Sequence, residues 1–234
     1  MYRFIKRAFD LISSSIALVV TSPLWLVIAI GVKLSSPGPV FYRSMRAGMN
    51  HREFAVYKFR SMHVYKPEDP SSGKKAEGGF VANANRMFKL GSFLRKSKLD
   101  ELPQLLSVFT GKMSIVGPRP YPEKAVRKFY TGEYECVMTV RPGLAGLDSL
   151  YDYAHGELFV KDNETYAATV LPVRSELARI YIEKKSIAVD LYCILRTVLL
   201  IFQIIVLKKK KFELTKYEKL AVQNVEARKA TQNK

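Results

Sequence analysis

The longest apolar stretch of the chain lies close to its N-terminus. Residues 11–32 carry no charge, and basic residues stand on both sides of them. As a helix this stretch would be roughly 33 Å long, enough to cross a bilayer core of about 30 Å. Ser22 and Pro23 lie near its middle, and a proline removes a backbone hydrogen bond and bends a helix. Taken alone, the pattern favours a kinked spanning helix over a re-entrant hairpin that returns to the face it entered.

Polar and apolar positions alternate in the segment that follows. Residues 40–46 and 54–60 both show this pattern, with Gly48 in the short stretch between them. The arrangement predicts a β-hairpin. Residues 66–85 are rich in proline, glycine, serine, asparagine and charge, which predicts a mobile loop. Residues 86–98 then predict a short cationic helix.

The second half of the chain is mostly helical in pattern. Residues 171–185 predict a helix of mixed polarity. Residues 187–207 are strongly apolar but include Asp190 and Arg196, which favours a helix lying in a membrane interface or packed on the domain over a second span. Residues 208–234 form a basic, polar tail that predicts a solvated or membrane-skimming helix. The fold class expected from these elements is mainly α with a small β-hairpin, an α+β protein.

The charge balance indicates an anionic partner. The 234 residues include 38 lysines and arginines against 21 acidic residues, a net charge of +17. Nucleic acid, anionic lipid headgroups and phosphorylated substrates all fit such an excess. Nucleic acid is the weakest of the three, because the basic residues flank apolar segments and no nucleic-acid-binding motif occurs. The two cysteines have no disulfide or metal-site spacing, which favours a reducing compartment. The three histidines are scattered without the spacing of a zinc site, which argues against zinc chemistry.

Two adjacent carboxylates, Asp100 and Glu101, begin an amphipathic segment. Ser97 stands three residues before Asp100 and predicts a capping box that places both acids in a first helical turn. The helix dipole and the basic residues just before the pair should keep both carboxylates ionised. The pair is a candidate nucleophile or metal ligand, although an ordinary capped surface helix would show the same pattern. Apolar residues recur around it at helical spacing: Leu99, Leu102, Leu105, Leu106 and Phe109.

Two arginines stand in stiff backbone segments further along. Arg119 lies between Pro118 and Pro120, which fixes the backbone on both sides of one guanidinium group. Arg141 precedes a Pro-Gly turn. A fixed arginine suits planar, bidentate recognition of phosphate.

Together these segments resemble the bacterial sugar transferase family, the monotopic phosphoglycosyl transferases. The resemblance covers residues 2–143, with a looser match near residues 181–190. Two stretches depart from the pattern of many members: residues 83–86, NANR in place of DDPR, and residues 144–148, where LAGLD replaces a stretch that begins ITG. The matching motifs, in order, are KRxxD at 6–10, SSPGPVF at 35–41, YKFRSM at 57–62, LDELPQL at 99–105, MSIVGPRP at 113–120 and RPG at 141–143.

The resemblance implies a specific reaction. Members of the family transfer a sugar-1-phosphate from a UDP-sugar to undecaprenyl phosphate and release UMP. By this likeness, Asp100 is the nucleophile that forms a phosphosugar intermediate, Glu101 is a metal or proton-handling partner, and both acids are expected to hold Mg²⁺. The residues expected to bind substrate are Lys58, Arg60, Arg95, Arg119 and Arg141.

The resemblance also implies an architecture. The family's hydrophobic segment is a re-entrant helix broken at a Ser-Pro pair, which reverses the preference stated above and assigns the break to Ser22 and Pro23. The expected organisation is a membrane-anchoring segment at residues 1–36, a compact cytosolic catalytic domain with interfacial helices at 37–207 and a basic polar tail at 208–234. The expected location is the cytosolic face of the bacterial inner membrane. Membrane lipids, the UDP-sugar and undecaprenyl phosphate are the expected partners, without nucleic acid and with a homodimer left open.

Two other functions compete with this hypothesis. A membrane-bound glycosyl transferase would pass on the sugar alone and release UDP, but such enzymes usually carry a DxD metal motif, which this sequence lacks. A non-catalytic, basic membrane-binding scaffold would explain the charge and the apolar helices. It would not explain the acidic pair or the arginine held between two prolines.

Overall fold

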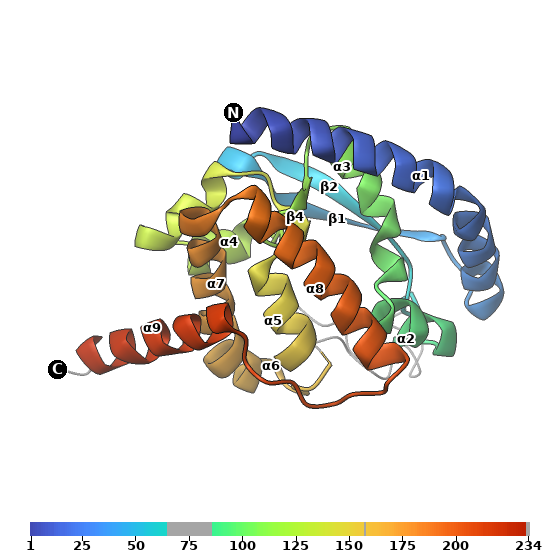
Figure 1. Cartoon of the computed structure of the whole chain (residues 1–234). Helices are drawn as coiled ribbons and strands as arrows, with labels where there is room; N and C mark the ends of the chain where they lie inside the picture. The colour runs from blue at the N-terminus through green and yellow to red at the C-terminus, as the bar shows by residue number, and fades with distance from the viewer. Residues whose placement is uncertain (65–85, 157, 233–234) are drawn as a thin grey trace.

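The computed structural model describes residues 1–64, 86–156 and 158–232, and it is mainly helical with a small two-stranded sheet (Figure 1). This confirms the predicted fold class; the loop expected at residues 66–85 lies outside the described residues. The helices are α1 (Tyr2–Ser35), α2 (Lys89–Lys96), α3 (Leu105–Phe109), α4 (Glu123–Phe129), α5 (Leu147–His155), α6 (Asn163–Thr165), α7 (Leu171–Lys184), α8 (Ile187–Ile205) and α9 (Lys216–Gln232). The strands are β1 (Phe41–Ala47), β2 (Glu53–Phe59), β3 (Ser114–Val116) and β4 (Gly143–Ala145), and tighter or wider turns form η1 (Met49–His51), η4 (Leu99–Gln104), η5 (Gly132–Thr139) and η6 (Tyr166–Val170).

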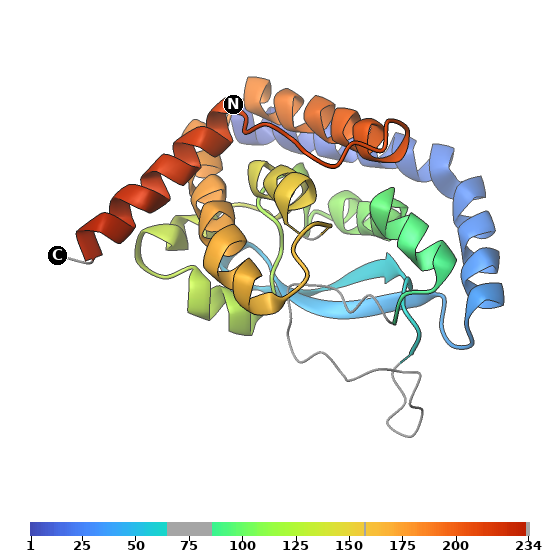
Figure 2. The same ribbon diagram turned by 90° about the horizontal axis from the view of Figure 1, so that it is seen from below.

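The long helix α1 contains Pro23 and changes direction along its length (Figure 2). Both α1 and α8 are long and apolar enough to cross a membrane, by length and composition alone. Most side chains in the middle of α1 are apolar and exposed, including Ile16, Val19, Val20 and Val27. Such a surface is not that of an ordinary soluble helix, because large contiguous apolar patches mark contact with a membrane or a partner.

The N-terminal part of α1 is fastened to the rest of the chain by the KRxxD motif. Lys6 pairs with Asp190 of α8 at 2.7 Å, and Arg7 donates to the carbonyl oxygens of Val108 and Phe109 at the end of α3. Buried Asp10 accepts hydrogen bonds from the Ser114 hydroxyl at 3.0 Å and the Ile115 amide at 2.9 Å. Three charged side chains of one helix thus bind three different elements.

The C-terminal part of α1 packs on the hairpin. Strands β1 and β2 pair in antiparallel register from Phe41 opposite Phe59 to Ala47 opposite Glu53, as the alternation predicts. Phe59 joins Ile28 and Val32 of α1 and Leu94 of α2 in one small apolar cluster. The hairpin is therefore covered on one side by the C-terminal part of α1 and by α2, and it carries Lys58 towards Glu101 of η4.

The main apolar core lies among α5, α7, α8 and α9. Asp190 does not disrupt α8, because its carboxylate binds Lys6, Tyr2 and Tyr181. One side of α8 thus packs on the domain, which is one of the two placements that the sequence favours over a second span, while its other side stays apolar and exposed. Figure 2 shows α8 beside the N-terminal part of α1, so the two helices form one face of the molecule.

The expected polar tail is instead partly built into this core. Residues 216–232 form α9, whose Ala221 and Val225 are buried against the domain. Glu176 of α7 is fully buried and binds Arg228 and Asn224 of α9. The pattern of apolar residues does not predict this packing, because α9 buries only Glu218, Ala221 and Val225 among its described side chains and holds its position through charged and polar contacts.

A short parallel pairing of β3 with β4, absent from the sequence prediction, positions the segment that carries Arg119. Gly143 lies so close to Gly117 that a Cβ atom at position 143 would come within 2.1 Å of the Gly117 nitrogen. Only a glycine permits this approach. The Ala47 amide donates to the Tyr121 carbonyl at 2.8 Å, which ties the same segment to the end of β1.

Candidate active site

The acidic pair lies in the tight helix η4, not in the first turn of a capped α-helix. The turn begins after Lys98, whose backbone is left-handed with φ 58° and ψ 11°. The predicted capping box is wrong, because the Ser97 hydroxyl donates back to the Phe93 carbonyl at 2.8 Å. Asp100 and Glu101 are nevertheless both buried, as a functional pair requires and a surface cap does not.

Glu101 binds two cations that are far apart in the sequence. Its Oε1 accepts from Lys58 Nζ at 2.6 Å and from Arg119 Nη2 at 2.7 Å, and Arg119 Nη1 approaches Oε2 at 3.4 Å. Burial works against ionisation of Glu101, but Arg119 and Lys58 outweigh it and hold the pKa of this carboxyl well below its usual range. Burial lowers the pKa of Lys58, while the charge of Glu101 acts in the opposite direction.

Asp100 has a different environment although it is the adjacent residue. It is 5% exposed, and among the described residues its Oδ1 is buried without a hydrogen-bond partner. Burial raises the pKa of the Asp100 carboxyl, and the adjacent Glu101 charge adds to the rise against the opposing effect of Lys58. The expected effect of the cations is therefore present at both acids: it prevails at Glu101, whereas at Asp100 burial and the Glu101 charge oppose it and raise the pKa.

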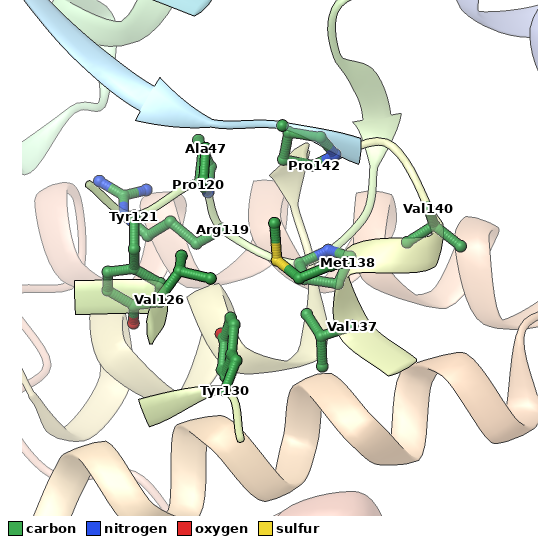
Figure 3. Close-up of a pocket in the computed structure, with 12 residues that line it drawn as sticks. Ala47, Arg119, Pro120, Tyr121, Val126, Tyr130, Val137, Met138, Val140 and Pro142 are labelled. Carbon is green, nitrogen blue, oxygen red and sulfur yellow. The ribbon is translucent and has the colours of Figure 1, made fainter. Parts of the chain in front are cut away.

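Arg119 is held by its backbone as well as by its side chain. Its amide donates to Asp148 Oδ2 at 3.0 Å. Figure 3 shows Arg119 beside apolar side chains that include Val126, Tyr130 and Met138, which with it line a cavity of about 10 Å³. Arg46 of β1 is a further cation near this arginine, and burial followed by the Arg119 charge lowers the pKa of Arg46.

Two of the arginines predicted to bind substrate donate to backbone carbonyl oxygens. Arg60 is buried and donates to backbone oxygens of Ser36, Pro37 and Pro39, so it secures the loop after α1. Arg141 donates through Nε to the Gly111 carbonyl at 2.7 Å. Arg95 does act at the pair, since its charge lowers the pKa of Asp100 against the effect of burial. The group brought together is thus Lys58, Glu101 and Arg119 with Asp100 beside them.

Lys98 is positioned beside the pair by an aromatic ring. Its Nζ lies 4.6 Å from the ring centroid of Tyr153 in α5, a cation–π contact. The hydroxyl of the same tyrosine donates to the Lys96 carbonyl. Tyr153 therefore holds both the backbone just before η4, through Lys96, and the ammonium group of Lys98. The charge of Lys98 favours ionisation of both acids.

A buried ionic network that sequence reasoning missed supports Arg119 from behind. Asp148, which accepts the Arg119 amide, lies 3.8 Å from Arg174 Nη2, and Arg174 Nη1 binds Asp152 at 2.9 Å. Tyr166 donates to Asp152 at 2.7 Å. Burial acts to lower the pKa of Arg174, but Asp152 and its other neighbours raise it well above the usual value. Asp148 and Asp152 stand four residues apart on α5, which places them on one face of the helix. This spacing is the sequence feature from which the network could have been predicted.

Removing Arg174 tests whether this network supports the segment around Arg119. Arg174→Met leaves two buried carboxylates without their shared cation, so the free energy of unfolding should fall by about 3–5 kcal/mol. The matched control is Arg127→Met, since Arg127 also pairs with an acid but is 72% exposed, and its loss should cost about 0–1 kcal/mol. Denaturant melts of both variants in the same detergent measure the difference, and equal stabilities would show that the network is not a support.

Comparison with known proteins assigns the chain to a family. The family model described as "Bacterial sugar transferase" matches residues 1–204. A UDP-glucose:undecaprenyl-phosphate glucose-1-phosphate transferase of Xanthomonas campestris is 43% identical over 60% of this chain and 28% of its own length. Its Escherichia coli namesake is 36% identical over 84% of this chain and 40% of its own length, and an Aeromonas hydrophila UDP-N-acetylgalactosamine-undecaprenyl-phosphate N-acetylgalactosaminephosphotransferase is 34% identical over 85% and 44%. This chain spans less than half the length of these three relatives. It belongs to the bacterial sugar transferase family.

Proposed function

We propose that the protein transfers a sugar-1-phosphate from a UDP-sugar to undecaprenyl phosphate and releases UMP. The names of its relatives, which describe this reaction with glucose and N-acetylgalactosamine donors, support the proposal. The observation that carries it is the asymmetric acidic pair. Asp100 keeps a buried oxygen that has no hydrogen-bond partner among the residues the structure describes, while Glu101 fixes two cations beside it. Such a pair supplies a nucleophile and a positive site for phosphate in one place.

The proposed mechanism has two steps. A carboxylate oxygen of Asp100 attacks the β-phosphorus of the donor, the bond to the bridging oxygen of UMP breaks, and UMP leaves as the Asp100 phosphosugar ester forms. A phosphate oxygen of undecaprenyl phosphate then attacks the same phosphorus, giving the diphosphate-linked sugar and free Asp100. Lys58 and Arg119 stabilise the negative charge that develops on the transferred group, because Glu101 already fixes both in place.

The residues at the site fit Mg²⁺ as a cofactor shared with the donor. Mg²⁺ is commonly held by one or two carboxylates together with substrate phosphates. The buried Oδ1 of Asp100, which has no partner in the described ranges, suits that role, whereas Glu101 would have to release Lys58 or Arg119 to coordinate the ion directly. The described residues contain no cluster of three or more acidic, histidine or cysteine side chains that could hold a metal, so the donor phosphates would complete the coordination. Bound there, Mg²⁺ would neutralise charge on the diphosphate.

Exchange of labelled UMP into the UDP-sugar tests the nucleophile. The wild-type protein with Mg²⁺ and its donor should catalyse this exchange without any lipid acceptor, because the first step is reversible and complete in itself. Asp100→Asn keeps the shape but removes the nucleophile, so exchange should disappear. Glu135→Gln removes an exposed carboxylate and should leave exchange at the wild-type rate. A glycosyl transferase would instead release UDP, and exchange that needs the acceptor would contradict the two-step mechanism.

Replacing Arg119 by lysine tests its fixed geometry. The guanidinium reaches Glu101 with two nitrogens, and a single ammonium cannot hold the carboxylate and a phosphate in the same fork. Arg119→Lys should lower kcat/KM for the donor by about 10- to 100-fold, or about 1–3 kcal/mol. Arg127→Lys on the exposed side of α4 is the control. Wild-type kinetics for Arg119→Lys would exclude the proposed role.

The same proposal includes a re-entrant α1 on the cytosolic face of the inner membrane. Both ends of the helix contact the same domain: Lys6 and Asp10 fasten its beginning, and Ile28 and Val32 pack at its other end. The middle is apolar and exposed, Pro23 lies within the helix, and the helix changes direction along its length (Figure 2). A straight spanning helix would pull its first residues away from these contacts, so the contacts favour entry and return on one side.

Cysteine labelling of spheroplasts tests this topology. Arg3→Cys and Glu226→Cys place exposed thiols near the start of α1 and on α9. A membrane-impermeant maleimide should modify neither from outside and both after permeabilisation, with the wild-type protein reporting any reaction of its native cysteines. Modification of Arg3→Cys alone in intact spheroplasts would show that the N-terminus has crossed the membrane.

A further inference from the structure

A cavity of about 240 Å³ lies directly beside the acidic pair, and the proposed chemistry of Asp100 does not use it. Its charged lining residues are Lys98, Glu101 and Arg119. Most of the remaining lining is apolar and comes from η4, α3, β4, α5 and α8. The side chains that define the apolar part are Leu102, Leu105, Leu144, Leu150, Ile194 and Val198.

The wall from α8 connects this cavity to the exposed apolar face of the molecule. Val198 lines the cavity and is also 64% exposed. Leu191, Leu195 and Phe202 are exposed along the same helix. Figure 2 shows α8 beside the N-terminal part of α1 on one face, with α5 and α3 in the layer beneath. The cavity therefore lies between the layer that presents apolar side chains outward and the charged groups of the site.

We propose that this cavity holds the first isoprene units of the polyprenyl phosphate acceptor, with the acceptor phosphate facing Lys98 and Arg119. The inference rests on the proposed function and adds the place where the lipid binds. A ligand with an apolar chain joined directly to a phosphate matches a lining that is mostly apolar and holds two cations and the Glu101 carboxylate at the site. The other polar members of the lining are the hydroxyl-bearing side chains of Ser149, Tyr153 and Thr197. A uracil base or a sugar would bury many polar groups against leucine, isoleucine and valine, which costs free energy unless each is hydrogen-bonded.

The mouth at Val198 gives the rest of the chain an exit. An acceptor tail is much longer than this cavity, so most of it must remain in the bilayer. Val198 lies where the cavity lining meets exposed apolar surface, which lets the tail pass from the site along α8 into lipid without crossing a polar region. Lys98 is suited to hold the phosphate end because Tyr153 fixes its ammonium group at the cavity.

Placing a bulky residue at the mouth of the cavity tests whether acceptor binding there is distinct from donor binding. Val198→Trp should raise the KM for undecaprenyl phosphate at least tenfold, in the range by which a pocket rejects a misfitting apolar group, while UMP exchange without acceptor stays within about twofold of wild type. The matched control is Leu195→Trp, because Leu195 is 69% exposed on the same helix and does not line the cavity. It should leave both readouts unchanged. Retained exchange also shows that the variant is folded.

The remaining outcomes contradict either the placement of the lipid in this cavity or the proposed function. Loss of exchange in Val198→Trp with an unchanged thermal melt would assign the cavity to the donor. An unchanged acceptor KM, in Val198→Trp and also in the deeper variant Ile194→Phe, would show that the lipid binds elsewhere. If Val198→Trp does not fold, Val198→Met supplies the smaller obstruction and the same two readouts decide. Absence of exchange in the wild-type protein would contradict the proposed function itself, independently of the cavity.

Discussion

The active site depends on one buried carboxylate that holds two cations together. Glu101 binds Lys58 from the hairpin and Arg119 from the segment between two prolines. Without it these cations would repel each other: burial lowers the pKa of Lys58, and the charge of Arg119 lowers it further. Breaking a buried charge group by removing one member is costly. The hairpin, η4 and the β3–β4 pairing therefore have to meet at this point for the site to exist.

The division of roles between the two acids follows from this contact. Glu101 accepts hydrogen bonds from Lys58 and Arg119, which hold its pKa low and keep its carboxylate engaged with these two cations. Asp100 is buried without a partner for Oδ1 in the described part of the chain, and burial raises its pKa. The surroundings thus shift the pKa values of two adjacent carboxylates in opposite directions, which supports the different roles proposed for them. Behind this pair, Asp148 accepts the backbone amide of Arg119 and lies near buried Arg174, so a second buried charge group fixes the backbone of Arg119.

Local patterns were sufficient for the elements but not for the contacts between them. Alternation predicted the hairpin, and the motif order predicted that Lys58, the acidic pair and Arg119 belong to one site. The capping box failed because Tyr153, more than fifty residues away, stabilises a left-handed Lys98 that no local rule favours. The backbone carbonyls that Arg60 and Arg141 bind were not predictable, because an arginine in a motif can hold backbone as well as phosphate. The packing of α9 depends on Glu176, a partner that the tail's own composition does not reveal.

The central claim is that Asp100 becomes covalently bonded to the phosphosugar, and intact-protein mass spectrometry tests it most directly. Wild-type protein would be mixed with Mg²⁺ and a UDP-sugar that supports turnover, without acceptor, and quenched rapidly. The account predicts a mass increase equal to one sugar phosphate that maps to Asp100 and is absent from Asp100→Asn. An unmodified wild-type protein under conditions of confirmed turnover and fast quenching, or an adduct on another residue, would contradict it.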